Sequence, residues 1–473
     1  MANRLVTRTG ASRPATAAGK PSRPQACRSR IWRDLLAHCG GAPVYGGRYT
    51  NVFFPDYRPK PGIVAYAEEL ASIRNGFGRL ILGARRNDSA AAIFYSPACY
   101  RARIVAMRDE AHYNAANEQN DLLAALSAAL GDLRIGSRFV AYEQVARGEL
   151  DPRTTKALFL WGALALSSSE TAAIRRYLNG GGVVIADGEP GLYDEHCHKR
   201  AAGSLHDCLP LDQTGLRSVG QGKFILYRGL GSRFMALRGY GVNGEATAPP
   251  AAETLQSLTQ FSTMLSQQAG LQPNFRLSGG HDVQIGNHVP MVDGREFVET
   301  VSAFDFVDGP ARYVACVIDG KEGQTYDARL SVSGTGHLYD CRAGKYLGAA
   351  GECAVELRAA TGNLFALLPY RVEGLEVTMP ARAALGQPID VKAVVRVAGG
   401  FFARHVIVLQ LRRPDGKELP QNRWVVETDK GIAGGQLFLA LNDPAGRWTL
   451  LARDVATGVQ KAVPIEIQAE AAQ

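Results

Sequence analysis

The hydrophobic pattern is clearest over residues 157–191, where it predicts a strand, a helix and a second strand in succession. Residues 157–161, ALFLW, form a short apolar run that is typical of a strand buried on both faces of a parallel sheet. Ser167 and Glu170 have the spacing of a capping box, so we expect a helix to begin there. The apolar run 183–186, VVIA, predicts the second strand, which a right-handed crossover makes parallel to the first.

The predicted helix between these strands has one apolar face and a defined end. Its apolar residues recur at spacings of three and four, which places them on one stripe. They are Ala173, Ile174, Tyr177 and Leu178. Residues 180–182, GGG, end the helix with residues that tolerate a positive φ, and no phosphate-binding pattern follows them. Residues 187–191 then follow the carboxyl end of a strand, where open α/β sheets usually place ligand sites.

The same alternation of strands and helices extends over residues 89–271 and predicts a doubly wound α/β domain. Short segments of period two follow, and they predict a β-sandwich over residues 272–380 and an immunoglobulin-like sandwich over residues 381–473. Residues 31–88 contain too little apolar surface to fold alone and need a neighbour. The predicted fold class is therefore multidomain, α/β plus all-β.

The net charge of +8 is concentrated at the N-terminus. Eight of the 53 basic residues precede the first acidic residue, Asp34, and the remaining basic residues equal the 45 acidic ones in number. The body of the chain is therefore neutral, and we expect no nucleic-acid partner. Residues 1–30 are predicted to be a disordered basic tail, with a basic arm for an anionic partner, an organelle-type leader or a misplaced start codon as alternatives.

The sequence leaves the compartment open. No stretch approaches the roughly 20 apolar residues of a membrane span, and the N-terminus lacks the apolar segment of a secretory signal. As written the chain is expected in the cytoplasm, and a missing true N-terminus would make it secreted or periplasmic. Eight scattered cysteines do not decide between these, although Cys316 and Cys341 lie in neighbouring predicted strands and are candidates for pairing in an oxidising setting.

Candidate chemistry is concentrated just after the second strand, in the segment DGEPGLYDEHCHKRAAGSLHDC. The candidate binding residues are Asp187, Glu189, Asp194 and His196. A structural zinc site is an alternative, because imidazole and thiolate are preferred zinc ligands, but the spacing matches no standard motif. Its candidate ligands are His196, His198, His206 and Cys208. The favoured interpretation is a polar surface or interface loop, and we predict no metal and no cofactor.

Other candidate residues have simpler structural interpretations. The sequence contains no GxSxG or GxCxG elbow, so Cys99 is interpreted as a structural thiol rather than a nucleophile. Glu68 and Glu69 lie beside the apolar stripe of a predicted helix and are interpreted as a solvated face rather than a catalytic pair. Three aromatic residues on alternating strands are interpreted as core rather than as a sugar platform. They are Tyr339, Trp424 and Trp448.

Three segments carry a resemblance to a known family. They are IWRDLLAHCGG from residue 31, VAYAEELASIRNGFGRLILGARRNDSAAAIFYSP from residue 64, and residues 157–191. Together they resemble the C-terminal portion of family 42 β-galactosidases, in which a catalytic TIM barrel precedes an amidotransferase-like trimerisation domain and β domains. The resemblance implies that residues 31–88 are the last strand and helix of a barrel. It also implies that residues 89–271 form a flavodoxin- or amidotransferase-like assembly domain of a homo-oligomer, with a trimer as the candidate state.

The catalytic part of that family has no counterpart in this sequence. Retaining glycosidases need two carboxylates about 5 Å apart, and in the family both precede the last barrel strand. Here no acidic residue precedes Asp34, so we assign no catalytic residue and do not expect this chain alone to be an enzyme. The preferred function is a non-catalytic, β-galactosidase-like part acting in assembly or carbohydrate-related binding. The alternatives are a subunit or fragment of an active β-galactoside hydrolase, and an envelope-associated carbohydrate-binding protein.

Overall fold

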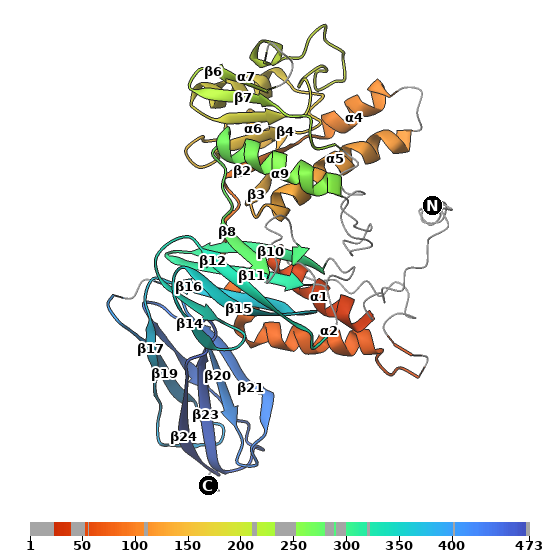
Figure 1. Ribbon diagram of the computed structural model, residues 1–473. Helices are drawn as coiled ribbons and strands as arrows, with labels where there is room; N and C mark the ends of the chain where they lie inside the picture. Colours follow the sequence, from red (N-terminus) through yellow and green to blue (C-terminus); the bar gives the residue numbers. More distant parts are fainter. Residues whose placement is uncertain are drawn as a thin grey trace.

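The computed structural model of the chain describes ten stretches of residues. They are 23–38, 53–54, 56–107, 112–210, 215–231, 252–279, 288–289, 299–318, 322–400 and 403–469. Figure 1 shows three units in succession: an α/β unit, a β-rich unit with two helices along it, and a C-terminal β unit. The prediction of an α/β part followed by β-rich parts is confirmed at this level. None of the helices in the described stretches is long and apolar enough to cross a membrane.

The sheet of the α/β unit has the strand order β3-β2-β4-β5-β7-β6. Neighbouring strands are parallel, except that β6 runs antiparallel to β7. The strands are β2 (Ala91–Tyr95), β3 (Ser137–Ala141), β4 (Ala157–Leu160), β5 (Val183–Ala186), β6 (Gly215–Val219) and β7 (Gly222–Leu226). The two apolar runs that opened the sequence analysis are thus the adjacent parallel strands β4 and β5.

Helices cover both faces of this sheet. They are α4 (Pro97–Ala106), α5 (His112–Asp132), α6 (Tyr142–Ala146), α7 (Ser168–Asn179) and α9 (Ala252–Gln267). Leu126 of α5 and Phe261 of α9 pack with Phe159 on one face. Ile174 of α7 packs with Leu158 on the other face. Burial on both faces explains why the central strands are unbroken apolar runs.

The predicted capping box at the start of α7 is confirmed. The hydroxyl oxygen of Ser167 accepts a hydrogen bond from the backbone N–H of Glu170 at 3.2 Å. In return, the Glu170 carboxylate accepts one from the backbone N–H of Ser167 at 2.5 Å. Two N–H groups that a helix start would leave unpaired are therefore satisfied locally.

The β-rich unit consists of two antiparallel sheets facing each other. One has the order β1-β10-β11-β16-β13-β14, with β9 also paired to β10, and the other has the order β15-β12-β8. Leu330 and Leu357 of the smaller sheet pack against Val314 and Phe365 of the larger one. The strands are β1 (Arg85–Arg86), β8 (Phe275–Gly279), β9 (His288–Val289), β10 (Glu299–Asp308), β11 (Ala311–Ile318), β12 (Thr325–Val332), β13 (His337–Asp340), β14 (Lys345–Ala349), β15 (Glu352–Arg358) and β16 (Gly362–Leu368).

The C-terminal unit is also built from two sheets, with the orders β17-β19-β22 and β18-β24-β23-β20-β21. Its strands are β17 (Val372–Thr378), β18 (Arg382–Ala384), β19 (Ile389–Val397), β20 (Val406–Arg412), β21 (Glu418–Glu427), β22 (Ile432–Leu437), β23 (Gly446–Asp454) and β24 (Gln460–Gln468). Strand β17 pairs with β19, although it precedes the expected domain boundary after residue 380. Strand β17 therefore pairs within the C-terminal unit although it begins about ten residues before the expected start at residue 381.

The candidate disulfide between Cys316 and Cys341 is not formed. Both residues are buried free thiols. Cys316 belongs to the core between the two sheets of the β-rich unit, whereas Cys341 belongs to the core shared with Trp32. The two side chains lie in different cores, so their sulfur atoms do not meet.

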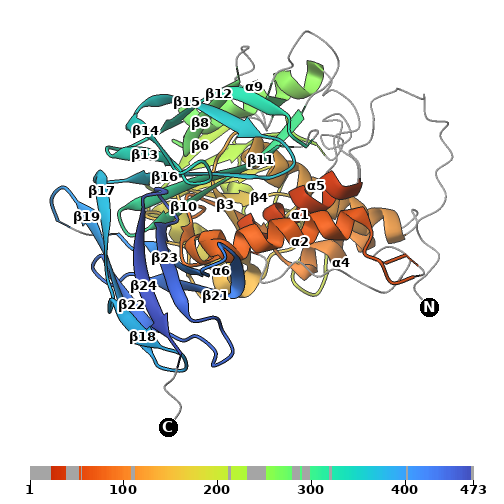
Figure 2. The ribbon, with the colours of Figure 1, turned by 90° about the horizontal axis from the view of Figure 1, so that it is seen from below.

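The described part of the segment expected to end a barrel contains helices that lie along the β-rich unit, as Figure 2 shows. They are α1 (Arg23–Leu36), α2 (Pro61–Ser72), the single turn η2 (Ile73–Phe77) and α3 (Gly78–Leu82). Helix α1 begins within the tail expected over residues 1–30, whose first 22 residues lie outside the described stretches. Its residues Trp32 and Leu36 pack on the sheet of β11 and β16.

The helical run is interrupted at Gly76, and the interruption fits the C-terminal unit. Gly76 has φ +109°, a conformation that residues with side chains rarely adopt. A Cβ atom there would lie 2.4 Å from Cγ2 of Val455 and 3.2 Å from Cγ2 of Val408. A close approach of helix to sheet therefore requires glycine at this position.

Gly76→Ala is expected to lower the free energy of unfolding by about 1–3 kcal/mol, because it combines an unfavourable φ with overpacking. Gly131→Ala is the matched control, since Gly131 lies in helix α5 with no atom within 4 Å of the added Cβ. The control should be neutral or stabilising by up to about 1 kcal/mol. Chemical denaturation of both variants measures the difference, and equal effects would contradict the packing of the helices on the C-terminal unit.

Candidate functional site

The structure places the predicted binding loop at the carboxyl edge of the α/β sheet. Asp187 follows β5, and its Oδ1 accepts a hydrogen bond from the backbone N–H of Gly162 at 2.8 Å. Burial raises the pKa of Asp187 above its usual range, and this hydrogen bond opposes the rise. Gly162 has φ +61°, and a Cβ there would lie 2.6 Å from the Gln119 side chain. Asp187 therefore joins the turns that follow β4 and β5.

The other predicted residues of the loop bind the loop itself. Glu189 accepts a hydrogen bond from the backbone N–H of Gly203 at 2.6 Å, and the same oxygen lies 2.8 Å from the His206 ring. Asp194 accepts backbone hydrogen bonds from His196 and His198, at 2.9 and 2.8 Å. These contacts lower the pKa of Asp194 to about 2. The two carboxylates act as internal ties of the loop.

The structure does not bring the candidate zinc ligands together. The His198 ring contacts Asp194, the His206 ring contacts Glu189, and the His196 side chain is exposed. Cys208 is buried among apolar side chains on the α7 face of the sheet. Within the described stretches no three His, Cys, Asp or Glu residues are grouped so that they could hold a metal ion.

Cys99 has the environment of a structural thiol. It is buried in α4, and its Sγ lies 3.3 Å from the carbonyl oxygen of Ala165, to which the thiol donates. Burial raises the pKa of Cys99 to about 11. Because the thiolate is the nucleophilic form, this cysteine is unsuited to nucleophilic attack at neutral pH.

The three aromatic residues weighed as a sugar platform are not exposed together. Trp448 and Tyr339 are fully buried, and Trp424 is half-buried. The Trp448 indole N–H donates to the carbonyl oxygen of Pro444 at 2.9 Å. Their side chains therefore contribute to the core.

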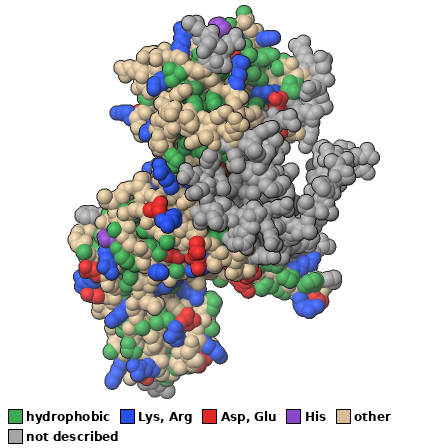
Figure 3. Space-filling view, in the orientation of Figure 1, with side chains coloured by type: hydrophobic (Ala, Val, Ile, Leu, Met, Phe, Trp, Pro, Cys, Tyr) green, Lys and Arg blue, Asp and Glu red, His purple; other side chains and the backbone are tan. Residues whose placement is uncertain are grey.

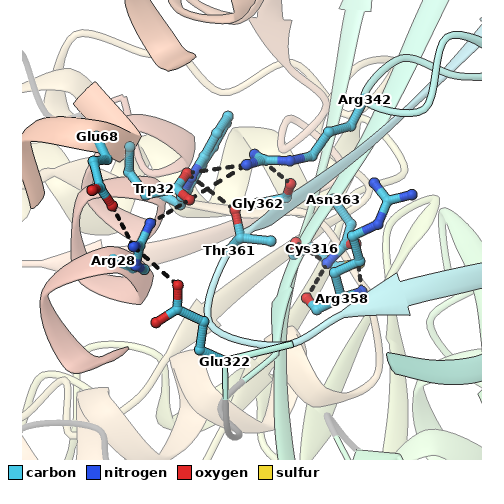
Figure 4. Close-up of polar contacts among 11 residues, drawn as sticks. Arg28, Trp32, Glu68, Cys316, Glu322, Arg342, Arg358, Thr361, Gly362 and Asn363 are labelled. Carbon is cyan, nitrogen blue, oxygen red and sulfur yellow. Dashed lines mark hydrogen bonds and ion pairs between the residues drawn. The ribbon is translucent and has the colours of Figure 1, made fainter. Parts of the chain in front are cut away.

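The interpretation of Glu69 as solvated is wrong, and this residue is the centre of a buried polar cluster. Only 5% of Glu69 is exposed, whereas the side chain of its neighbour Glu68 is 56% exposed. Oε2 of Glu69 accepts hydrogen bonds from Nε1 of Trp32 at 2.5 Å and from the Thr361 hydroxyl at 3.1 Å. The Arg342 guanidinium lies 3.3 Å from the same oxygen. Figure 4 shows Trp32, Thr361 and Arg342 converging from three separate segments.

Arg28 links this cluster to the protein surface. Its guanidinium lies 3.4 Å from Glu69, 2.5 Å from Glu68 and 3.0 Å from Glu322. Helix α1 therefore supplies one cation to two carboxylates of α2 and to one just before β12. Arg28 lies beside Glu68 and Glu322 in Figure 4, and its positive charge offsets the repulsion among the three carboxylates.

A cavity of about 290 Å³ lies beside this cluster. Its lining consists of Arg28, Glu69, residues 322–325, Arg342 and residues 358–361. In the last of these segments Ala360 has φ +59°, which is uncommon for alanine and indicates that the surrounding contacts impose the turn.

Asn363 fixes that turn from its far side. Its side-chain oxygen accepts a hydrogen bond from the backbone N–H of Arg358 at 2.8 Å, and its side-chain N–H donates to the Arg358 carbonyl oxygen at 2.9 Å. Figure 4 shows both contacts. The cavity therefore has a polar lining and a wall that is already ordered without a ligand.

Sequence reasoning missed this site because its parts are far apart in the chain, but one signal was present. Ala65, Glu69 and Ile73 recur at spacings of four, and all three are buried. A carboxylate on the buried stripe of a helix needs partners. Arg342 and Thr361 follow it by about 270 and 290 residues, so no local pattern identifies them.

Comparison with solved structures finds partial similarity to β-galactosidases. A catalytic mutant of Gan42B, a GH42 beta-galactosidase from G. stearothermophilus, matches 67% of this chain and 45% of that chain, with 13% sequence identity and a TM-score of 0.44. The beta-galactosidase from Bacillus circulans sp. alkalophilus matches 65% of this chain and 45% of that chain, with 13% identity and a TM-score of 0.42. The cold-adapted enzyme from Rahnella sp. R3 matches 64% and 44%, with 12% identity and a TM-score of 0.39.

Part of the chain is similar to family 42 β-galactosidases, as the sequence predicted. The chain spans about 45% of the length of the first two of these enzymes. No family model and no curated protein matches the sequence.

The burial difference between adjacent glutamates is directly testable. Glu69→Gln removes a buried charge that two half-buried guanidinium groups face and is expected to destabilise the protein by about 3–5 kcal/mol. Glu68→Gln affects an exposed pair and should cost about 1 kcal/mol or less. Chemical denaturation compares the two variants. If Glu68→Gln costs as much as Glu69→Gln, the buried cluster does not hold α2 in place.

Proposed function

We propose that this chain is a glycoside hydrolase-like protein whose own role is to bind carbohydrate rather than to hydrolyse it. The observation that carries the proposal is the cavity beside Glu69, with arginine, carboxylate, hydroxyl and backbone groups in its lining. Small-molecule sites combine concave shape with a few fixed polar groups, and their volumes start near 300 Å³. A cavity of about 290 Å³ therefore suits one sugar ring.

The state of the lining carboxylates favours binding over hydrolysis. A retaining glycosidase needs one carboxyl group to give a proton and a second, free carboxylate to attack the sugar. Glu69 already accepts hydrogen bonds from Trp32 and Thr361, and Glu322 is paired with Arg28. Glu69 is buried and already bonded, so it is not free to attack a sugar, whereas Glu322 is 54% exposed and remains available as a hydrogen-bond acceptor for a ligand. One available carboxylate does not make the pair that hydrolysis needs. The alternatives, a subunit of an active β-galactoside hydrolase and an envelope-associated binding protein, use the same cavity differently.

The sequence resemblance makes a β-galactoside the first ligand to test. Methyl β-galactoside is expected to bind the purified full chain, and Glu322→Gln is expected to weaken binding several-fold because it removes a charged hydrogen-bond acceptor from the lining. Glu352→Gln is the matched control: Glu352 pairs with Arg329 outside the cavity and is 55% exposed, against 54% for Glu322. Saturation-transfer NMR measures both affinities.

The same preparations test hydrolysis. The chain alone is expected to release no nitrophenol from 4-nitrophenyl β-galactoside. If the wild type releases nitrophenol and the Glu322→Gln variant does not, the result would contradict a role in binding alone and would support the hydrolase alternative. If the Glu322→Gln and Glu352→Gln variants bind the galactoside with equal affinity, the cavity beside Glu69 is not the galactoside site.

Assembly is a second candidate role, favoured by the open edge of the α/β sheet. Strands β3-β2-β4-β5-β7 follow the order of flavodoxin-like sheets, which supports the expected trimerisation-like domain. Phe139 on the edge strand β3 is 50% exposed, and Tyr95 on β2, two residues beyond the register partner of Phe139, is 41% exposed. Exposed aromatic side chains are typical of protein interfaces. We propose that a second copy of the chain covers them.

Light scattering of the purified chain is expected to give the mass of a homo-oligomer, with three copies as the expected number. Phe139→Glu should shift the protein towards the monomer, because a charge at an apolar contact is left unpaired. Phe438→Glu is the control, since Phe438 is 52% exposed but belongs to the C-terminal unit. A wild-type monomer at micromolar concentration would contradict the assembly role.

A further inference from the structure

A second and larger cavity lies where the α/β unit meets the β-rich unit. Its volume is about 660 Å³, and its lining includes Arg85, Arg86 and Arg138 together with one carboxylate, Asp88. Arg85 and Arg86 form β1, which pairs with β10 of the β-rich unit, whereas Arg138 lies on β3 of the α/β unit. Figure 3 shows basic side chains (blue) at the narrow waist between these units. Ligand sites occur preferentially at such junctions.

Arg86 pairs with Asp88, and Arg85 and Arg138 line the same cavity. The Arg86 Nε lies 3.6 Å from a carboxylate oxygen of Asp88. Burial raises the pKa of Asp88, and the positive charges of Arg86, Arg138 and Arg85 all oppose that rise. Such an effect requires the three charges to lie close to the same carboxylate.

The cations at this junction outnumber the anion. Arg85 forms no ion pair with any described residue, and the same is true of Arg138, whose terminal nitrogen contacts only the Thr155 hydroxyl at 3.5 Å. Within the lining, three guanidinium groups and one carboxylate leave a surplus of two positive charges, although Arg138 also lies within electrostatic range of Glu149 outside the lining. Such a surplus in a half-buried cavity favours a ligand that carries two negative charges.

The segment that carries the arginines is held rigidly. The Asn87 side chain donates a hydrogen bond to a carboxylate oxygen of Asp305 at 2.6 Å. The backbone carbonyl oxygen of Asn87 accepts a hydrogen bond from the Asn274 side chain at 2.8 Å. Gly136, just before β3, lies so close that a Cβ there would be 1.9 Å from the Asn87 carbonyl oxygen. The two walls of the cavity are therefore set before any ligand arrives, which reduces the entropic cost of binding.

We propose that this junction cavity binds a phosphomonoester, such as a sugar phosphate, and that the ligand bridges the two units. A phosphomonoester carries about two negative charges at neutral pH and presents three acceptor oxygens. Arginine forks pair with such oxygens bidentately. The volume of the cavity exceeds that of the site beside Glu69, so it accommodates the organic group as well as the phosphate. This inference is independent of the proposed carbohydrate site.

Isothermal titration of the full chain with galactose 6-phosphate tests the proposal. Arg138→Gln is expected to weaken binding at least tenfold, and Arg85→Gln, at an exposed position, should act in the same direction without disturbing the fold. Arg153→Gln is the control, because Arg153 is in the same unit, is 88% exposed and pairs with Asp151 away from the cavity. Wild-type affinity should fall as salt rises, since the attraction is electrostatic.

Hydrogen exchange gives a second measurement of the bridging role. Bound galactose 6-phosphate is expected to slow exchange in residues 85–90 of the wild type and not of Arg138→Gln. Inorganic phosphate that binds as tightly as the ester would overturn the assignment of an ester ligand. Unchanged ester affinity in both the Arg138→Gln and Arg85→Gln variants would overturn the site. Galactose without the phosphate serves as the ligand control. If its affinity is the same for the wild type and for Arg138→Gln, the loss of galactose 6-phosphate affinity in the variant is due to the phosphate group.

Discussion

The buried charge of Glu69 is the constraint on which the arrangement of the N-terminal helices depends. A carboxylate removed from water is costly unless donors and cations surround it. Trp32 of α1, Arg342 after β13 and Thr361 before β16 meet this requirement together. Gly362 makes the arrangement possible, because a Cβ atom there would lie 2.2 Å from the Trp32 ring. The polar cluster and the close approach of α1 to β16 therefore depend on each other.

This docking makes one continuous core out of segments that look separate in the sequence. Trp32 and Leu36 belong to the same apolar cluster as Tyr313 of β11 and Trp448 of β23. The helices, the larger sheet of the β-rich unit and the C-terminal sandwich therefore share their interior. The cavity beside Glu69 lies at the margin of this shared core, so its walls are packed on several sides. Rigid support of this kind is what a binding site requires of its surroundings.

The sequence was sufficient where structure is determined locally and insufficient where it is determined by distant partners. Ser167 and Glu170 predicted their own capping box, because both groups of the motif lie within one turn. The apolar runs of β4 and β5 predicted a buried parallel pair for the same reason. Glu69 was wrongly interpreted as solvated, because two of its partners, Arg342 and Thr361, follow it by about 270 and 290 residues. The loop after β5 lies at the carboxyl edge of the sheet, yet the contacts of Glu189 and Asp194 within it could be known only from its three-dimensional path.

The net charge read from the sequence is limited in the same way, because a neutral total does not show how basic and acidic side chains are distributed around each cavity. The basic residues after Asp34 equal the 45 acidic residues in number, yet the two cavities differ in how their arginines are compensated. Beside Glu69, Arg28 and Arg342 face the carboxylates of Glu69 and Glu322, so a neutral ligand encounters hydrogen-bonding groups without a strong field. In the lining of the junction cavity three arginines face one carboxylate, Asp88, so an anion would gain free energy from the charges it neutralises. The two proposed sites therefore differ in the charge of the ligand that each favours.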